Sequence, residues 1–179
     1  MKLLFDASQI REGTERVAAR IREAFAGEEL IVLAVLRGGI VFAADLIRAL
    51  GVPVRLDAVS VRSYRGRATT SDSPRITSAP ALELAGQCVL VVDDILDTGW
   101  TLSCIRDEVL RRGARRVATA VLLEKSSRRQ AAIEPDFVVF TVENVWVVGY
   151  GLDHDERFRH LPYIAALEEE DVASPPGPN

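Results

Sequence analysis

Short, unbroken apolar runs alternate with amphipathic segments along this chain, and this alternation restricts its fold more than any other sequence feature. Residues 30–36 (LIVLAVL) and 88–92 (CVLVV) are too short for typical helices, and such runs are typical of strands buried on both faces of a sheet. Further strands are expected at 54–61, 116–123, 137–142 and 146–148. Helices are expected at 8–26, 40–50 and 98–112, with Ser8 as the N-cap of the first helix. This order predicts an α/β fold with a mostly parallel central sheet flanked by helices.

The composition is typical of a globular chain and argues against several classes of partner. The 179 residues suit a single domain over residues 1–170, followed by a disordered, proline-containing tail at 171–179. The formal net charge of −4 argues against nucleic-acid binding, and no apolar stretch approaches the ~20 residues that span a bilayer. Cys88 and Cys104 lack metal-ligand spacing and are expected to be reduced, buried packing residues. Because polar residues begin too early for a signal peptide, we expect a cytoplasmic protein.

The strongest local signal is the segment VVDDILDTGWT, which begins at Val91. Asp93 and Asp94 follow a buried strand, and open parallel sheets bind ligands beyond the carboxyl ends of their strands. The turn at 97–101 then leads into a helix N-terminus, whose free N–H groups and dipole suit a phosphate. Because carboxylates repel phosphates, the two aspartates are better placed to face hydroxyl groups or a cation. A sugar phosphate with Mg²⁺ nearby satisfies both demands, although adjacent aspartates alone could simply end a strand.

This segment resembles the signature of the type I phosphoribosyltransferases. The resemblance implies the fold of that family, with a small hood and a flexible lid loop at about 62–78, and phosphoribosyl diphosphate with Mg²⁺ as its cosubstrate. It implies that Asp93 and Asp94 hold the ribose hydroxyls, and that Asp97 is the catalytic acid/base group near purine N7. The positions implied for the 5′-phosphate are Asp97, Thr98, Gly99, Trp100 and Thr101.

The C-terminal third is similar to the hypoxanthine/guanine branch of that family, through residues 135–140, 146–153, 156–159 and 161–164. A lysine after a buried strand, Lys125, would donate to a 6-oxo group, which favours hypoxanthine and guanine over adenine. The Leu36–Arg37 peptide is expected to be cis by the same resemblance. The implied site residues are Lys125, Trp146, Val147 and Asp153 for the purine, Leu36, Arg37, Gly38 and Arg159 for pyrophosphate, and Asp93, Asp94 and Asp153 for the metal.

The branch implies an enzyme of purine salvage. It would transfer the 5-phosphoribosyl group from phosphoribosyl diphosphate to N9 of hypoxanthine and/or guanine, giving IMP or GMP and pyrophosphate, and would form homodimers or homotetramers. Ser63 and Tyr64 match the start of a lid that closes over the reaction. The arginine-rich remainder of this lid departs from the family pattern, as does Trp100 in the phosphate turn. The sequence therefore does not choose among hypoxanthine, guanine and xanthine.

Other interpretations stay open at this point. A non-catalytic nucleotide sensor on the same fold is disfavoured by the apparently complete set of catalytic positions and by the absence of any evident DNA-binding segment. A xanthine-preferring enzyme stays open, whereas Lys125 and Trp146 argue against a pyrimidine. A generic doubly wound binding domain would leave the matched loops as coincidences.

Overall fold

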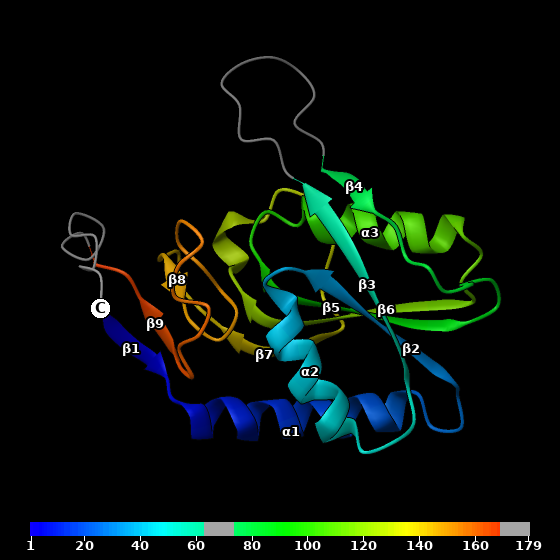
Figure 1. The fold of residues 1–179 in the computed structure, drawn as a ribbon, viewed down its shortest axis with the longest axis horizontal. Helices are drawn as coiled ribbons and strands as arrows, with labels where there is room; N and C mark the ends of the chain where they lie inside the picture. The colour runs from blue at the N-terminus through cyan, green and yellow to red at the C-terminus, as the bar shows by residue number, and fades with distance from the viewer. Residues whose placement is uncertain (63–73, 169–179) are drawn as a thin grey trace, which may run out of the picture.

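A six-stranded, mostly parallel sheet forms the centre of the computed structural model, which describes residues 1–62 and 74–168 (Figure 1). Its strand order is β4-β3-β2-β5-β6-β7, and only the edge strand β4 runs antiparallel to its neighbour. The strands are β2 (Leu30–Leu36), β3 (Arg55–Arg62), β4 (Arg75–Ser78), β5 (Cys88–Leu96), β6 (Arg116–Glu124) and β7 (Phe137–Thr141). The predicted α/β class with a mostly parallel central sheet is therefore confirmed.

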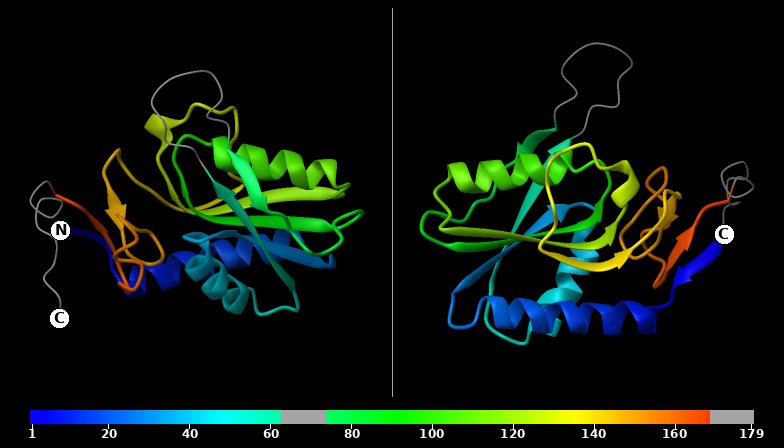
Figure 2. Two further views of the ribbon diagram at one scale, coloured as in Figure 1. Left: turned by 45° about the horizontal axis from the view of Figure 1, so that its top comes forward. Right: turned by 180° about the vertical axis from the view of Figure 1, so that it is seen from behind.

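Helices cover both faces of this sheet (Figures 1 and 2). The helices α1 (Ala7–Ala24) and α2 (Gly39–Leu50) lie on one face, and α3 (Trp100–Arg111) lies on the other. Alternate residues of β2 enter the two cores: Val32 packs with the α1 and α2 side, and Leu33 with the α3 side. Burial on both faces explains why the central strands are continuous apolar runs.

A second, smaller sheet lies at one end of the molecule and forms the hood (Figure 2). It joins β1 (Lys2–Phe5), β9 (Ile164–Ala166) and β8 (Val147–Val148) in the order β1-β9-β8, with antiparallel pairing throughout. Segments from the two ends of the described chain thus lie side by side. The loops on either side of β8 reach the carboxyl ends of the central strands, where they contribute to the cavity described below.

The structure corrects several predicted boundaries. The N-cap of α1 is Asp6 rather than Ser8, because Asp6 and Gln9 form a reciprocal capping box. The strand β5 continues to Leu96, so that Asp93 and Asp94 lie within it rather than beyond it, and α3 begins at Trp100 rather than at residue 98. The predicted loop at 62–78 was wrong in its last part, because residues 75–78 form β4 against the exposed end of β3. The strands β1 and β9 were not predicted.

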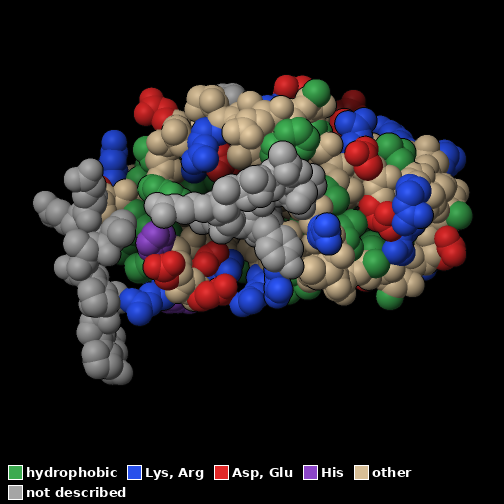
Figure 3. All heavy atoms as spheres, turned by 90° about the horizontal axis from the view of Figure 1, so that it is seen from above, with side chains coloured by type: hydrophobic (Ala, Val, Ile, Leu, Met, Phe, Trp, Pro, Cys, Tyr) green, Lys and Arg blue, Asp and Glu red, His purple; other side chains and the backbone are tan. Residues whose placement is uncertain are grey.

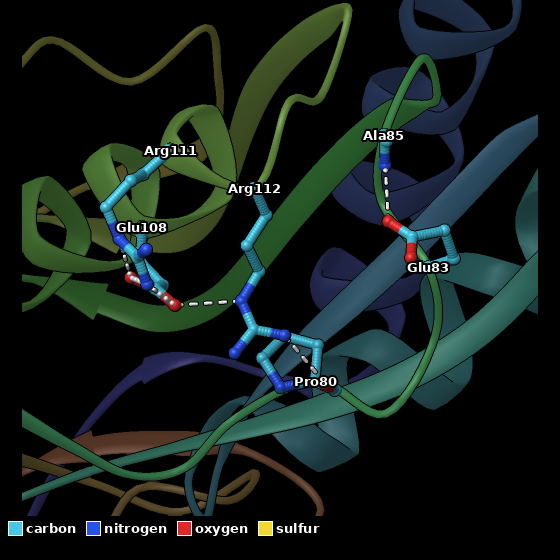
Figure 4. A network of polar contacts seen from close by, with 6 residues as sticks. All are labelled: Pro80, Glu83, Ala85, Glu108, Arg111 and Arg112. Carbon is cyan, nitrogen blue, oxygen red and sulfur yellow. Dashed lines mark hydrogen bonds and ion pairs between the residues drawn. The ribbon is translucent and has the colours of Figure 1, made fainter.

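The structure confirms a further local expectation, since the Leu36–Arg37 peptide is cis. Both cysteines are free thiols; Cys88 is buried in the core as predicted, whereas the predicted burial of Cys104 was wrong, because this residue is only partly buried. The end of α3 is tied to the segment before β5, because the Arg112 guanidinium donates to the Pro80 carbonyl at 3.0 Å and to Glu108 at 2.8 Å (Figure 4). Within residues 1–62 and 74–168, no helix is both long and apolar enough to cross a membrane.

Candidate active site

A cavity of about 700 Å³ opens at the carboxyl ends of β2, β5 and β6. These strands are parallel neighbours, so the segments that follow them meet at one edge of the sheet. Segments flanking β8 close the cavity from the hood side. Its lining includes Val35, Leu36, Arg37, Gly38, Val61, Asp93, Asp94, Ile95, Leu96, Asp97, Thr98, Gly99, Thr101, Leu102, Lys125, Arg128, Trp146, Asp153 and Arg159.

Two adjacent carboxylates occupy the floor of the cavity. Asp93 is only 6% exposed, and its Oδ1 accepts a hydrogen bond from the Asp94 N–H at 2.9 Å. Burial, with a further contribution from the negative charge of Asp94, raises the pKa of Asp93 well above its usual range. Burial also raises the pKa of Asp94, although hydrogen bonds and the positive charge of Arg159 oppose this shift. Burial therefore destabilises a doubly ionised pair, and the pair favours ligands that offer hydroxyl donors or positive charge.

The turn after β2 packs directly on this pair. A Cβ atom at Gly38 would overlap the Asp94 carboxylate, and one at Gly39 would lie 3.0 Å from the Val92 carbonyl oxygen. Glycine at position 38 is thus required by a close approach to a side chain rather than by its backbone angles, which are φ −60° and ψ −45°. This contact brings the Leu36–Arg37 peptide to the edge of the cavity.

A tight turn joins β5 to α3, and Thr98, Gly99 and Thr101 around the start of the helix line the cavity. Gly99 adopts φ +89°, a conformation suited to glycine, and a Cβ there would lie 2.9 Å from Ile133. The Thr98 carbonyl accepts hydrogen bonds from the N–H groups of Gln130 and Ala131, both at 3.0 Å. The turn is therefore held from behind by the segment after β6. A helix N-terminus presented in this way suits an anion.

Charged groups of both signs gather at the hood side of the cavity. Glu156 Oε2 lies 2.9 Å from Arg37 Nη1 and 3.3 Å from Arg159 Nη2. Arg159 also pairs with Asp153 at 2.8 Å and donates to the Gly151 carbonyl at 2.7 Å. Figure 3 shows acidic and basic side chains next to one another on the face seen from above. Carboxylates thus neutralise both Arg37 and Arg159 at this side of the cavity.

The remaining wall carries one lysine and one exposed indole. Lys125 follows the last residue of β6 and is 5% exposed, and its N–H donates to the Leu96 carbonyl at 2.9 Å. Burial lowers the pKa of its ammonium group, while the negative charge of Asp97 opposes this shift. Trp146 lines the cavity although it is 54% exposed, and its ring meets that of His154 edge to face with centroids 5.9 Å apart. An exposed aromatic surface beside a buried donor suits a flat, polar heterocycle.

Comparison with known proteins decides the family. The phosphoribosyl transferase domain model matches residues 3–155. The chain belongs to the phosphoribosyltransferase family. A hypoxanthine-guanine phosphoribosyltransferase from Streptococcus pneumoniae is 38% identical over 169 residues, which cover 94% of each chain.

Solved structures extend this relationship to the whole fold. A hypoxanthine phosphoribosyltransferase from Staphylococcus aureus superposes with a TM-score of 0.91 at 31% identity and covers 98% of this chain and 95% of its own. A mutant hypoxanthine phosphoribosyltransferase from Trypanosoma cruzi, solved as a ternary substrates complex, gives a TM-score of 0.90 at 36% identity, with 96% and 97% covered. The predicted family and its type I fold are confirmed.

Most residues that the family resemblance singled out meet in this cavity. The exceptions are few. Val147 is buried in β8 and is absent from the lining, while Trp100 is 49% exposed and directs its Nε1 at Gln130 Oε1, 3.3 Å away. Ser63 and Tyr64 lie outside the described residues, as does the expected tail at 171–179.

Among the charged residues that line the cavity, one, Arg128, was missed. It belongs to the short 3₁₀ helix η1 (Ser126–Arg128) and lies 3.1 Å from Asp97. Nothing in the polar run after Lys125 distinguishes it from a solvated arginine in the sequence.

The carboxylates on the cavity floor suit a hard divalent cation that arrives with a substrate. Within the described residues, no group of three or more histidine, cysteine or acidic side chains could hold a metal on its own. Mg²⁺ typically takes one or two carboxylates and completes its shell with waters and substrate phosphates. Asp93 and Asp94, whose ionised forms are disfavoured by burial, suit that arrangement. Asp153 would first have to give up contacts, since its two oxygens already meet Arg159 and the Glu156 N–H.

Proposed function

We propose that this chain is a purine-salvage enzyme that transfers the 5-phosphoribosyl group from phosphoribosyl diphosphate to N9 of hypoxanthine and/or guanine, giving IMP or GMP and pyrophosphate. The observation that carries this proposal is the cavity itself. One space holds an aspartate pair of which Asp93 is buried, a helix N-terminus, the arginines Arg37 and Arg159, and a buried lysine together with an exposed indole. These features suit, respectively, a sugar diol, a phosphate, a diphosphate and a 6-oxopurine.

The phosphoribosyl part would lie between β5 and α3. Asp93 and Asp94 would accept hydrogen bonds from the ribose 2′- and 3′-hydroxyls, which adds donors to a pair whose ionisation burial disfavours. The 5′-phosphate would meet the N–H groups of the turn from Asp97 to Thr101. The side chain of Trp100 points to Gln130, so only its backbone would contribute.

The base would lie between the lysine and the indole. The Lys125 ammonium would donate to the 6-oxo group, an interaction that the 6-amino group of adenine cannot accept. The Trp146 ring would stack on the purine. Val147 is buried beside it, so its contribution would come from backbone groups.

The leaving diphosphate would meet Arg37 and Arg159. Both guanidiniums lie at the same rim of the cavity, where they would stabilise negative charge as the bond from C1 to the diphosphate oxygen breaks. A Mg²⁺ ion bound with the diphosphate, held by Asp93, Asp94 or Asp153, would add charge neutralisation at this point. As purine N9 bonds to C1, Asp97 would accept the proton that N7 loses.

An activity panel tests the proposal. Purified protein is incubated with phosphoribosyl diphosphate and Mg²⁺, and pyrophosphate release is measured with hypoxanthine, guanine, xanthine, adenine and uracil. Turnover with hypoxanthine or guanine, and none with adenine or uracil, is expected. A preference for xanthine would correct the base, and nucleotide binding without turnover of any base would indicate a sensor. Assembly into homodimers or homotetramers and a cytoplasmic location stay predictions, which light scattering and cell fractionation can check.

A further inference from the structure

Arg128 is the charged residue of the cavity to which the proposed reaction gives no task. It ends η1, the turn that directly follows β6 and Lys125. Its side chain is 41% exposed, and its Nε lies 3.1 Å from Asp97 Oδ1. Both residues line the cavity. Arg128 thus contacts the group proposed to handle the proton of the purine.

Asp97 has a second cation within electrostatic reach. Lys125 is nearly fully buried, and the negative charge of Asp97 raises the pKa of its ammonium group, whereas the positive charge of Arg128 lowers it. Two opposite charges in a partly buried cavity attract each other strongly. Among the residues that the structure describes, however, Asp97 pairs with Arg128, and no ion pair within 4.0 Å joins it to Lys125. Arg128, and not Lys125, is therefore the counter-ion of Asp97 in this structure.

The contact leaves the aspartate available as an acceptor. Asp97 Oδ1 is buried and accepts no hydrogen bond from any described residue, although the Arg128 guanidinium is in contact with it. A buried acceptor without a donor is costly, and a ligand N–H at this position would satisfy it. Arg128 thus neutralises the charge of Asp97 without occupying its hydrogen-bonding capacity.

The segment that follows Arg128 is hydrogen-bonded to the turn that carries Asp97. The N–H groups of Gln130 and Ala131 bond to the Thr98 carbonyl, so the segment after η1 is attached to the turn that carries Asp97. Arg129 anchors this segment further, since it pairs with Glu124 and donates to the Ile133 carbonyl at 2.7 Å. Arg128 and Asp97 are therefore held by two segments that bond to each other.

We infer that Arg128 is a positioning residue that serves as the counter-ion of Asp97, and so prevents Asp97 from collapsing into a salt bridge with Lys125. Both groups then stay available to the base, Lys125 as the donor to the 6-oxo group and Asp97 as the acceptor at the imidazole. The inference rests on the proposed function. It goes beyond that function because it assigns a task to a residue that does not itself need to touch the substrate.

Steady-state kinetics of Arg128→Gln, Arg128→Lys and Arg111→Gln test the inference. Arg111 is the matched control, because it is an arginine paired with a carboxylate, Glu108, on α3 and away from the cavity (Figure 4). Arg128→Gln is expected to raise the KM for hypoxanthine about tenfold and to leave the KM for phosphoribosyl diphosphate within about twofold. Arg128→Lys, which retains the positive charge, should recover most of the loss, and Arg111→Gln should match the wild type.

A double-mutant cycle separates this task from a general structural one. An Asp97→Asn background has no carboxylate at position 97 that could form a salt bridge with Lys125. Adding Arg128→Gln in this background should therefore change the KM for hypoxanthine by less than about twofold. Equal losses in both KM values, no rescue by lysine, or additive effects in the cycle would each overturn the inference.

Calorimetric titration with IMP distinguishes this inference from the proposed function. If the wild type releases no pyrophosphate with any base, the proposed function fails. The affinity of the same variants for IMP still tests whether Lys125 is available to donate to the 6-oxo group. Arg128→Gln is then expected to bind IMP about tenfold more weakly than Arg111→Gln does. Equal IMP affinities for these two variants would overturn the inference, whatever the wild-type activity.

Discussion

Glu156 accepts a hydrogen bond from Arg37 at 2.9 Å, although 119 positions separate the two residues in the sequence. The same carboxylate oxygen lies 3.3 Å from Arg159. Glu156 thus connects the two arginines to which the proposed reaction assigns the leaving diphosphate. A diphosphate bound to these arginines would therefore compete with the Glu156 carboxylate.

Removing this carboxylate should tighten diphosphate binding. Glu156→Gln eliminates both the competition for Arg37 and the repulsion between Glu156 and the diphosphate. Since Arg37 and Glu156 are both more than half exposed, solvent weakens their pairing, and we expect only about a two- to fivefold lower inhibition constant for pyrophosphate. Glu134→Gln is the control, because Glu134 is an exposed glutamate paired with Arg129. Weaker pyrophosphate binding in Glu156→Gln would show that the carboxylate supports the site instead.

A methyl group at position 38 should damage the ribose end of the site. The backbone angles of Gly38 suit alanine, so Gly38→Ala acts only through the overlap of its Cβ with the Asp94 carboxylate. We expect the KM for phosphoribosyl diphosphate to rise at least about tenfold. Thermal unfolding of Gly38→Ala, Asp94→Ala and the double variant provides the check, because removing the carboxylate should relieve the overlap. Strictly additive destabilisation would mean that the two residues do not interfere.

The buried aspartate pair should make stability fall as pH rises. The pKa of Asp93 is raised in the folded protein, while an unfolded aspartate titrates near about 3.9. Between these two values the folded state holds a proton that the unfolded state has released. Stability is therefore greatest below the unfolded pKa and decreases until the pH passes the folded pKa.

Asp93→Asn removes this dependence. With EDTA present to exclude divalent cations, we expect the variant to melt several degrees above the wild type at about pH 8, and at nearly the same temperature at about pH 4. Asp155→Asn is the control, because Asp155 is exposed and its backbone, at φ +50°, tolerates asparagine. A variant that melts below the wild type at the higher pH would contradict the sign of the predicted effect.

Much of the fold could be predicted because its strands are buried on both faces. The run at 30–36 matches β2 residue for residue, since seven consecutive apolar residues are too few for a typical helix and suit a strand that is buried on both faces. The short edge strand β4 (RITS) could not be predicted, because only its pairing with β3, and no apolar run of its own, defines it. The boundary of β5 was misplaced for a related reason: Asp93 and Asp94 look like a strand end, yet the ladder with β6 continues past them.

Part of the candidate site was suggested by residue types that indicate their own chemistry. Adjacent aspartates after a buried strand and a glycine turn before a helix have that character, whereas Lys125 was assigned only through the family resemblance. Arg128 has no such character, because its importance comes from a contact with Asp97 that only the folded chain creates. Trp100 belongs to the predicted phosphate turn, and its indole contacts Gln130 rather than lining the cavity, which leaves the prediction that this turn binds phosphate through its backbone untested.

The chain's two tryptophans provide a matched pair for testing the base site. Trp146 and Trp100 are similarly exposed, at 54% and 49%, but only Trp146 lines the cavity. Because an aromatic face is expected to stack on the purine, Trp146→Leu should raise the KM for hypoxanthine about tenfold. Trp100→Leu should change it by less than about twofold, since the phosphate turn binds through its backbone.

The Trp100→Leu variant also isolates the fluorescence of Trp146. Titration of this variant with IMP should change its emission, because the base would lie against the remaining indole. The complementary variant, Trp146→Leu, should show little change on the same titration, since Trp100 points away from the cavity. A response from Trp100 and none from Trp146 would mean that the purine binds near Trp100. The proposal that the base stacks on Trp146 would then be wrong.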